Sequence, residues 1–391
     1  MQKLGIILKK GKESIFQNRH LWIFSGAIAS YPSHFENGHI YPVYSHEGAF
    51  LGSGYFNQGK SLAGRILAFG EVDPWQMLCS HLDKAIFLRD QLFDQKTTNA
   101  FRLVNGEGDF IPGLVIDQYD KYLVIQSGSL GMDLLKKNIV DYLAGKKRWK
   151  GIYEKSSGSS RKEEKLQDNI GVLWGEEKED ITVLENGFSF KVYWKKGQKT
   201  GFFLDQREMR AQIKELSHNK KVLNVFSYSG GFSVYAMAGG AKSVDSLDNS
   251  TQATEWAKQN FQLNGFSEGR SRFLTQDAFS FLSKESLDYD LIILDPPAFA
   301  KKKHDVSQAS KGYREINYQT LSKMPKGSFL LTCSCSYYVD EELFQTLIFQ
   351  AAKMANRSVQ IIGKHLLAKD HPINLFHPES HYLKSLLLYV D

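Results

Sequence analysis

The chain has 391 residues, 42% of them hydrophobic and 24% charged, which excludes a mainly disordered, collagen-like or fibrous protein. Lysine and arginine number 49 against 43 acidic residues, and the net charge of +6 allows a nucleic-acid partner without requiring one. Three cysteines are too few for a disulfide framework and favour a reducing compartment. We therefore expect a cytoplasmic protein with no membrane partner, since the N-terminal apolar run is too short for a secretion signal and no stretch approaches the roughly 18 apolar residues of a membrane span.

Short runs rich in glycine and aromatic residues dominate residues 1–72. Ile40–Tyr44 and Gly52–Phe56 are two of these runs, and turn residues separate them. This pattern predicts a small β-barrel or sandwich as the first of three domains.

The middle of the chain, residues 73–180, is predicted to be an α+β domain. A helix is expected to begin after Asp73, because proline, the next residue, suits the first helical turn. Strand patterns then run up to Gln126, and a helix is expected near 132–143. The polar stretch 154–168 is predicted to be a loop.

The third domain, residues 181–391, is predicted to begin with a β-hairpin over 181–200. Asn186-Gly187 between two apolar runs is typical of a two-residue hairpin turn. Strand and helix patterns alternate after residue 205, which implies a parallel sheet with helices on both faces, a Rossmann-like α/β fold. The predicted strands are Val222–Phe226, Ser243–Leu247, Arg272–Thr275, Leu291–Leu294 and Ser328–Cys333.

Informative residues follow the first three predicted strands, at the edge where open parallel sheets bind ligands. Two adjacent glycines, Gly230 and Gly231, follow the first strand and let a ligand approach the backbone. Asp248, after the second strand, could accept hydrogen bonds from ribose hydroxyls, and Asp277, after the third, from an adenine amino group. Each aspartate could instead simply cap the next helix.

The sequence Asp295-Pro296-Pro297 follows the fourth strand and is a more specific signal. Two prolines cannot continue a strand, so they form a stiff loop that can hold Asp295 toward a reacting centre. The ordered set of a glycine turn, two acids and Asp-Pro-Pro resembles class I S-adenosylmethionine-dependent methyltransferases. That resemblance implies S-adenosylmethionine as methyl donor, S-adenosylhomocysteine as product, and no metal.

Cys335 is predicted to lie just past the fifth strand, beside the Asp295 loop. Cysteine often only packs in a core, and an isolated Cys333-x-Cys335 pair cannot complete a zinc site. A thiolate at this edge could add to carbon 6 of a pyrimidine, which lets carbon 5 attack a sulfonium methyl group. Cys335 therefore indicates 5-methylpyrimidine chemistry, whereas core packing is expected for Cys333.

Nearly the whole chain resembles one family, the RlmI-type 23S ribosomal RNA cytosine-5 methyltransferases, which carry an N-terminal PUA domain. The similar segments are His20–Ile28, Arg102–Asp109, Pro112–Asp117, Lys199–Arg207, Asp370–Pro372 and Tyr382–Lys384. Cys335, in Thr-Cys-Ser-Cys-Ser, matches the nucleophile of the family. The cofactor-binding residues that the resemblance implies are Gln206, Arg207, Asn224, Phe226, Gly230, Asp248, Asp277 and Asp295.

Basic and aromatic residues follow the Asp295 loop. A lysine run is usually only a solvated surface, but here it flanks the predicted substrate mouth, so phosphate contacts and base stacking are expected. The predicted substrate-binding residues are Pro296, Pro297, Phe299, Lys301, Lys302, Tyr313 and Arg314.

The main hypothesis is an enzyme that methylates carbon 5 of a cytosine in large-subunit ribosomal RNA through a covalent cysteine–RNA intermediate. Cys335 would be the nucleophile, and Asp295 would hydrogen-bond the cytosine edge. Two alternatives stay open: an RNA purine N-methyltransferase on the same scaffold, and a non-catalytic RNA-binding or assembly factor. The target nucleotide, the base that removes the carbon-5 proton, and a homodimeric state are also open.

Overall fold

A computed structural model describes residues 5–365 and 367–391, which form two compact units. Unit 1 comprises the residues up to 186, together with 192–204 and 369–380, and unit 2 comprises 187–191, 205–368 and 381–391. In the described residues, no helix is long and apolar enough to cross a membrane. The first four residues of the N-terminal run considered above lie outside this description, and the domain boundaries expected near residues 72 and 180 stay predictions.

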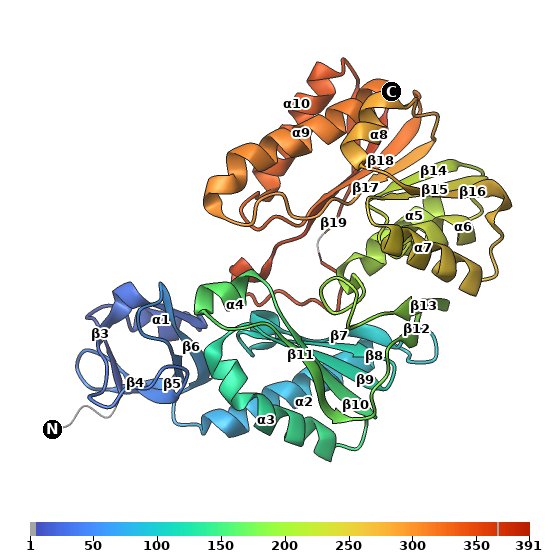
Figure 1. The fold of residues 1–391 in the computed structure, drawn as a ribbon. Coiled ribbons are helices and arrows are strands. Elements are labelled where there is room, and N and C mark those ends of the chain that lie inside the picture. The colour runs from blue at the N-terminus through green and yellow to red at the C-terminus, as the bar shows by residue number, and fades with distance from the viewer. Residues whose placement is uncertain (1–4, 366) are drawn as a thin grey trace. The chain divides into compact units, whose positions relative to one another are not determined.

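A six-stranded sheet of short strands forms the first part of unit 1, drawn in blue in Figure 1. Its strand order is β2-β6-β5-β4-β1-β3. Neighbouring strands are antiparallel except β1 and β4, which are parallel. The elements of this part are β1 (Ile6–Leu8), α1 (Ser14–Gln17), β2 (Trp22–Phe24), η1 (Ser25–Ala27), β3 (Ile28–Ser30), β4 (Ile40–Tyr44), β5 (Phe50–Phe56) and β6 (Leu62–Phe69).

A five-stranded sheet follows in unit 1, in the order β11-β10-β9-β8-β7, and one hydrophobic core joins it to α2 and α3. Its elements are α2 (Pro74–Leu92), β7 (Ala100–Asn105), η2 (Gly106–Asp109), β8 (Leu114–Tyr119), β9 (Tyr122–Ser127), α3 (Leu130–Gly145), β10 (Gly151–Ser156), α4 (Ser159–Glu164) and β11 (Asn169–Gly175). Helix α2 begins at Pro74, as predicted, and Asp73 caps it, because its Oδ1 accepts a hydrogen bond of 2.8 Å from the backbone N–H of Gln76.

The stretch 154–168 is not the loop that its polar composition predicted. It contains the end of β10 and the helix α4. Arg161 in α4 is buried, donates to both carboxylate oxygens of Asp133 at 2.9 Å, and donates to the carbonyl of Ser127 at 3.0 Å. These long-range contacts hold the helix in place, and composition alone gives no sign of them.

The predicted hairpin turn is present between β12 (Ile181–Glu185) and β13 (Phe188–Val192). Asn186 and Gly187 have φ angles of +49° and +83°, which are the positive values that a two-residue type I′ turn requires.

A seven-stranded sheet forms the centre of unit 2, in the order β16-β15-β14-β17-β18-β20-β19. Strands β14 to β18 are parallel and were predicted, whereas β20 runs antiparallel to both β18 and β19. The sheet strands are β14 (Lys221–Val225), β15 (Ser243–Asp248), β16 (Ser271–Thr275), β17 (Leu291–Leu294), β18 (Ser328–Ser334), β19 (Val359–His365) and β20 (Lys384–Val390). The helices of this region of the chain are η3 (Leu204–Gln206), α5 (Arg207–Leu216), α6 (Gly231–Ala238), α7 (Thr251–Leu263), η4 (Glu268–Arg270), α8 (Ala278–Lys284), η5 (Lys303–Asp305), α9 (Val306–Lys323) and α10 (Glu341–Met354). A further short helix, η6 (Pro378–Ser380), belongs to unit 1.

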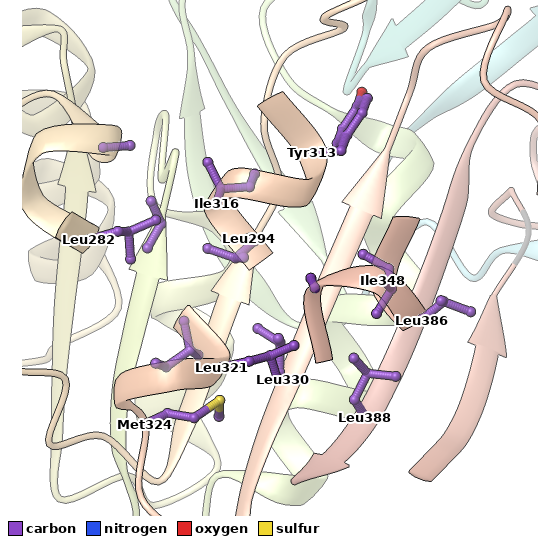
Figure 2. Packing of buried hydrophobic residues seen from close by; sticks show 14 of the residues in the cluster. Leu282, Leu294, Tyr313, Ile316, Leu321, Met324, Leu330, Ile348, Leu386 and Leu388 are labelled. Atoms are coloured by element: carbon purple, nitrogen blue, oxygen red, sulfur yellow. The ribbon is translucent and has the colours of Figure 1, made fainter. Parts of the chain in front are cut away.

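Two hydrophobic cores cover the two faces of the seven-stranded sheet. Helices α8, α9 and α10 pack on one face, where Leu282, Ile316 and Ile348 meet Leu294 and Leu330 of the strands (Figure 2). Helices α5 and α6 pack on the other face, in a cluster that includes Met209, Ile213, Phe232, Ala236, Leu291, Leu331 and Cys333. The sheet is thus covered on both sides, and its strand ends are left to form a site.

Candidate active site

The carboxyl ends of the five parallel strands meet at one edge of the sheet in unit 2, where ligands of such folds bind. Residues predicted to act in catalysis or cofactor binding stand at each of these ends. Gly230 follows β14, Asp248 ends β15, Asp277 follows β16, Asp295 follows β17, and Cys335 follows β18.

The loop after β14 is a tight turn with alternating left-handed residues. Phe226, Tyr228 and Gly230 have φ angles of +62°, +46° and +78°. A Cβ atom on Gly230 would lie 2.9 Å from the Cβ of Ala257 in α7, so both the backbone angle and the space require glycine. The buried hydroxyl of Ser227 in this loop has no hydrogen-bond partner among the described residues.

Asn224 lies below this loop, in the buried part of β14. Its Nδ2 donates to Ser233 Oγ at 2.9 Å, and that hydroxyl pairs with Ser246 Oγ at 2.7 Å. The Asn224 side chain therefore helps to hold α6 against the sheet. Asn224 is a buried strand residue, whereas Phe226, another predicted cofactor-binding residue, lies in the loop.

Asp248 is fixed by two backbone N–H groups. Its Oδ2 accepts from Tyr228 at 2.9 Å and its Oδ1 accepts from Ser250 at 3.0 Å. The N-cap of α7 is Ser250, whose hydroxyl accepts from Ala253 N–H at 3.2 Å, so Asp248 is not merely the helix cap. This carboxylate instead joins the ends of two neighbouring strands.

Asp277 does cap a helix, as the alternative interpretation proposed. Its Oδ1 accepts a hydrogen bond of 2.8 Å from Ser280 N–H at the start of α8. The residue is nevertheless exposed, so capping and contact with a ligand are compatible.

Gln206 connects η3 to the Asp295 loop. The amide is buried, and its Nε2 donates to Asp295 Oδ1 at 3.1 Å. Its Oε1 has no hydrogen-bond partner among the described residues, and such buried acceptors are uncommon in proteins. Gln206 Oε1 and the Ser227 hydroxyl fit a polar ligand at this edge, and the neighbouring Arg207, also buried, begins α5.

Cys335 is partly exposed at the end of β18. Its Sγ lies 3.8 Å from the carbonyl oxygen of Pro296, to which the thiol can donate. The next residue, Ser336, accepts a hydrogen bond of 3.1 Å from Ala300 N–H at its Oγ. Two adjacent residues thus attach the cysteine turn to the double-proline loop.

Lys384 of β20 was not assigned a role from the sequence, although it stands next to this turn. Its Nζ donates to the carbonyl oxygens of Ser336 and Tyr382, both at 2.6 Å. Burial lowers the pKa of Lys384 to about 8, while a negative charge on Cys335 acts to raise it. The pairing of Ser334 with Lys384 in the antiparallel ladder creates this contact, and no local sequence signal shows that pairing.

Cys333 is fully buried in the core cluster on the α5–α6 face. Burial raises the pKa of its thiol well above the ordinary value, so the neutral form persists. This environment agrees with core packing.

The predicted substrate-binding residues other than Tyr313 differ in their exposure to solvent. Pro297, Lys301 and Lys302 are exposed. Pro296 is buried, Phe299 is partly buried, and Arg314 donates to Gln350 Oε1 at 3.1 Å.

Tyr313 corrects the sequence prediction that it offers a surface for base stacking. Its side chain is 0% exposed, its ring centroid lies 4.7 Å from that of Phe299 and 5.6 Å from that of Phe344, and its hydroxyl pairs with Ser336 Oγ at 2.9 Å. The helical spacing of Ala309, Tyr313 and Ile316 turns this face of α9 toward the core. Tyr313 therefore supports the cysteine turn from below.

Comparisons with known proteins agree with this architecture. Residues 161–357 match the family model of S-adenosylmethionine-dependent methyltransferases, and residues 6–69 match that of PUA-like domains. The ribosomal RNA large subunit methyltransferase I of Alteromonas mediterranea is 36% identical over 98% of each chain. The protein of the same name from Vibrio vulnificus strain YJ016 is 38% identical over 97% of this chain and 98% of its own.

A solved structure is similar over the same length. The crystal structure of SMU.776, a methyltransferase complexed with SAH, has a TM-score of 0.84 and 25% sequence identity, and the match covers 98% of this chain and 99% of that one. These findings confirm the predicted PUA-like and methyltransferase folds.

Proposed function

Because the chain belongs to the ribosomal RNA large subunit methyltransferase I family, we propose that it methylates carbon 5 of a cytosine in large-subunit ribosomal RNA, with Cys335 as nucleophile. The observation that carries this proposal is the place of Cys335. The sulfur is partly exposed at the carboxyl edge of the sheet and contacts the loop that begins with Asp295.

The chemistry of the cytosine ring calls for a thiol at this position. Carbon 5 is a poor nucleophile, whereas addition of a thiolate to carbon 6 forms a C–S bond and moves the electron pair of the 5,6 double bond toward carbon 5. When bound, S-adenosylmethionine would supply an electrophilic methyl group to carbon 5 and would leave as S-adenosylhomocysteine. Loss of the carbon-5 proton to a base and expulsion of the Cys335 thiolate then restore the double bond. Methylation of a ring or amino nitrogen needs no such thiol.

Asp295 is suited to hold the cytosine edge. Gln206 already donates to its Oδ1, which fixes the orientation of the carboxylate. A carboxylate offers about four acceptor positions, so this bond leaves capacity for the exocyclic amino group of cytosine. Asp295 thereby orients the ring so that carbon 6 faces Cys335.

The edge residues of the first three strands and of η3 would hold S-adenosylmethionine. Asp248 would accept from the ribose hydroxyls, since each of its oxygens accepts only one backbone bond that the structure shows, and Asp277 would accept from the adenine amino group. Gly230 permits close backbone approach, and Gln206 Oε1 is an acceptor that a ligand amino group would satisfy. The proposed cofactor set is completed by Arg207, Asn224, Phe226 and Asp295, with Asn224 acting by support of α6.

The test is covalent trapping on RNA in which cytidine is replaced by 5-azacytidine. The ring nitrogen at position 5 blocks the elimination step, so a cysteine that adds to carbon 6 stays attached. We expect a complex that survives denaturation with the native chain, none with Cys335→Ala, and an undiminished complex with Cys333→Ala as the matched control. Absence of a complex with a native chain that transfers methyl groups to purines would favour the N-methyltransferase instead. Absence of both activities, without binding of S-adenosylmethionine, would favour the non-catalytic factor.

A further inference from the structure

Three metal-ligating side chains lie together in unit 1, whereas the residues proposed for methyl transfer all belong to unit 2. They are His20, just before β2, His377, just before η6, and Glu379, within η6. One ligand atom from each side chain lies within 4.8 Å of the other two. His20 and Glu379 are 359 positions apart in the sequence, so no spacing motif announces the cluster.

Each oxygen of the Glu379 carboxylate lies near one of the two imidazoles, at a separation close to what one small cation needs. The distance from His20 Nε2 to Glu379 Oε1 is 3.2 Å, and that from His377 Nδ1 to Glu379 Oε2 is 3.7 Å. Tetrahedral zinc with bonds of about 2.0–2.1 Å places its ligand atoms roughly 3.3 Å apart. The carboxylate thus stands between the two imidazoles at nearly the required spacing.

The state of His377 points to a missing ligand. The residue is 0% exposed, and neither ring nitrogen has a hydrogen-bond partner among the described residues. A buried polar group without a partner is costly, and a bound cation would give one of the two ring nitrogens a partner.

The surroundings of the cluster also suit a metal. The backbone N–H of Trp22 donates to His20 Nδ1 at 3.2 Å, and the carbonyl oxygen of Trp22 lies at the same distance, so the ring is held with Nε2 toward Glu379. A metal ion would take the place of the proton on Nε2. The side chains of His20 and Glu379 are 22% and 35% exposed, so solvent reaches the cluster from one side. This opening gives a cation access and gives a water molecule room to complete the coordination.

We infer that His20, His377 and Glu379 bind one divalent cation of the zinc class, with water as the fourth ligand. Two imidazoles and one carboxylate are a ligand set that zinc favours. The ion would connect the start of β2 to the 369–380 segment, within unit 1. This inference departs from the expectation of no metal, which rested on the cysteine pair and on the resemblance to methyltransferases.

The inference is tested on the full chain after chelator treatment and dialysis, by titration with Co²⁺ and then competition with Zn²⁺. We expect one ion per chain by elemental analysis, visible absorption typical of tetrahedral Co²⁺, and no thiolate charge-transfer band. Loss of an outer partner of a metal ligand weakens binding by about 10–100-fold, so loss of a ligand in Glu379→Gln or His377→Phe should weaken it by at least about 100-fold.

His39→Phe is the matched control. His39 Nε2 lies 3.1 Å from Glu36 Oε2, which is the same chemistry with only two ligands, and both side chains are exposed. This variant should bind like the native chain. A native chain that takes up no stoichiometric metal, or binding that Glu379→Gln leaves intact, would overturn the inference and would assign the cluster to a plain histidine–carboxylate hydrogen bond. These readouts are independent of methyl transfer.

Discussion

The Sγ atom of Cys335 lies 3.8 Å from the carbonyl oxygen of Pro296, so the sulfur after β18 meets the loop after β17. That same loop carries Asp295, whose carboxylate is held by Gln206. The positions of the proposed nucleophile and of the proposed base-orienting acid are therefore set by one stiff loop, whose two prolines limit its freedom.

Lys384 should promote formation of the Cys335 thiolate. A thiolate on Cys335 raises the pKa of Lys384, so by reciprocity the ammonium of Lys384 lowers the pKa of the thiol. Because burial lowers the pKa of Lys384 to about 8, this support is present below pH 8 and is lost as the pH rises above it. Asp340 also interacts with this lysine and opposes the effect of burial on its pKa. In Lys384→Met we expect Cys335 to be alkylated several-fold more slowly at pH 7, measured with iodoacetamide and peptide mass spectrometry.

Lys155→Met is the matched control, because it also removes a lysine whose pKa is lowered by burial. Lys155 belongs to unit 1, burial also lowers its pKa to about 8, and its Nζ donates to the carbonyl of Trp194 at 2.6 Å. This variant should leave the alkylation rate of Cys335 unchanged. Equal rates in Lys384→Met and the native chain would show that the lysine only holds the Ser336 carbonyl.

Gly230→Ala should destabilise the fold and weaken binding of S-adenosylmethionine. The new Cβ would meet Ala257 at 2.9 Å while the backbone keeps a φ of +78°. Left-handed strain and overpacking together suggest a loss of about 1–3 kcal/mol in the free energy of unfolding. Gly145→Ala at the end of α3, where nothing lies within 4 Å, should change that free energy by less than about 0.5 kcal/mol. Denaturant unfolding and calorimetry provide the two readouts, and similar losses in both variants would refute the packing argument.

Arg89→Met should be strongly destabilising, because it leaves the buried carboxylate of Asp109 without its charged partner and with only the backbone N–H of Asn105 as a donor among the described residues. Arg89 donates to both oxygens of Asp109, at 2.6 and 2.7 Å, and to the carbonyl of Asp370 at 2.7 Å, all within unit 1. Breaking a buried pair from one side costs about 3–5 kcal/mol in the free energy of unfolding. Lys137→Met removes the exposed pair with Asp141 and should cost about 0.5 kcal/mol or less. A loss below 1 kcal/mol for Arg89→Met would contradict the expected contribution of the Arg89–Asp109 pair to the free energy of unfolding.

The exposed lysines after the Asp295 loop should contribute to RNA affinity through phosphate contacts. In the double variant Lys301→Ala, Lys302→Ala, the slope of log affinity against log salt should become shallower by about 0.7 per lost contact on single-stranded RNA. The matched control is the double variant Lys242→Ala, Lys326→Ala. Both lysines are exposed, and they precede β15 and β18 at the opposite edge of the sheet. Fluorescence anisotropy at several salt concentrations would distinguish the two, and identical slopes would remove these lysines from the interface.

The sequence predicts the site best for residues that lie directly at or after the carboxyl ends of predicted strands. Asp248, Asp295 and Cys335 were expected at the carboxyl ends of parallel strands, and local apolar runs are sufficient to locate those ends. The contact between Cys335 and the loop after β17 follows from neighbouring strands in a parallel sheet.

Other features depend on long-range pairing, which local patterns do not contain. Lys384 reaches the cysteine turn only because β20 runs antiparallel beside β18, and Arg161 turns a polar stretch into a helix by pairing with Asp133. The burial of Tyr313 could have been predicted from the sequence, since Ala309, Tyr313 and Ile316 recur at helical spacing. Its position among basic residues instead favours an exposed side chain, and that prediction was wrong.

The most direct test of the account is mass spectrometry of nucleosides from large-subunit ribosomal RNA after incubation with S-adenosylmethionine and the native chain, Cys335→Ala or Cys333→Ala. If Cys335 is the nucleophile, we expect 5-methylcytidine with the native chain and with Cys333→Ala, and none above background with Cys335→Ala. Formation of 5-methylcytidine by Cys335→Ala at the native rate would contradict the assignment of Cys335 as the nucleophile.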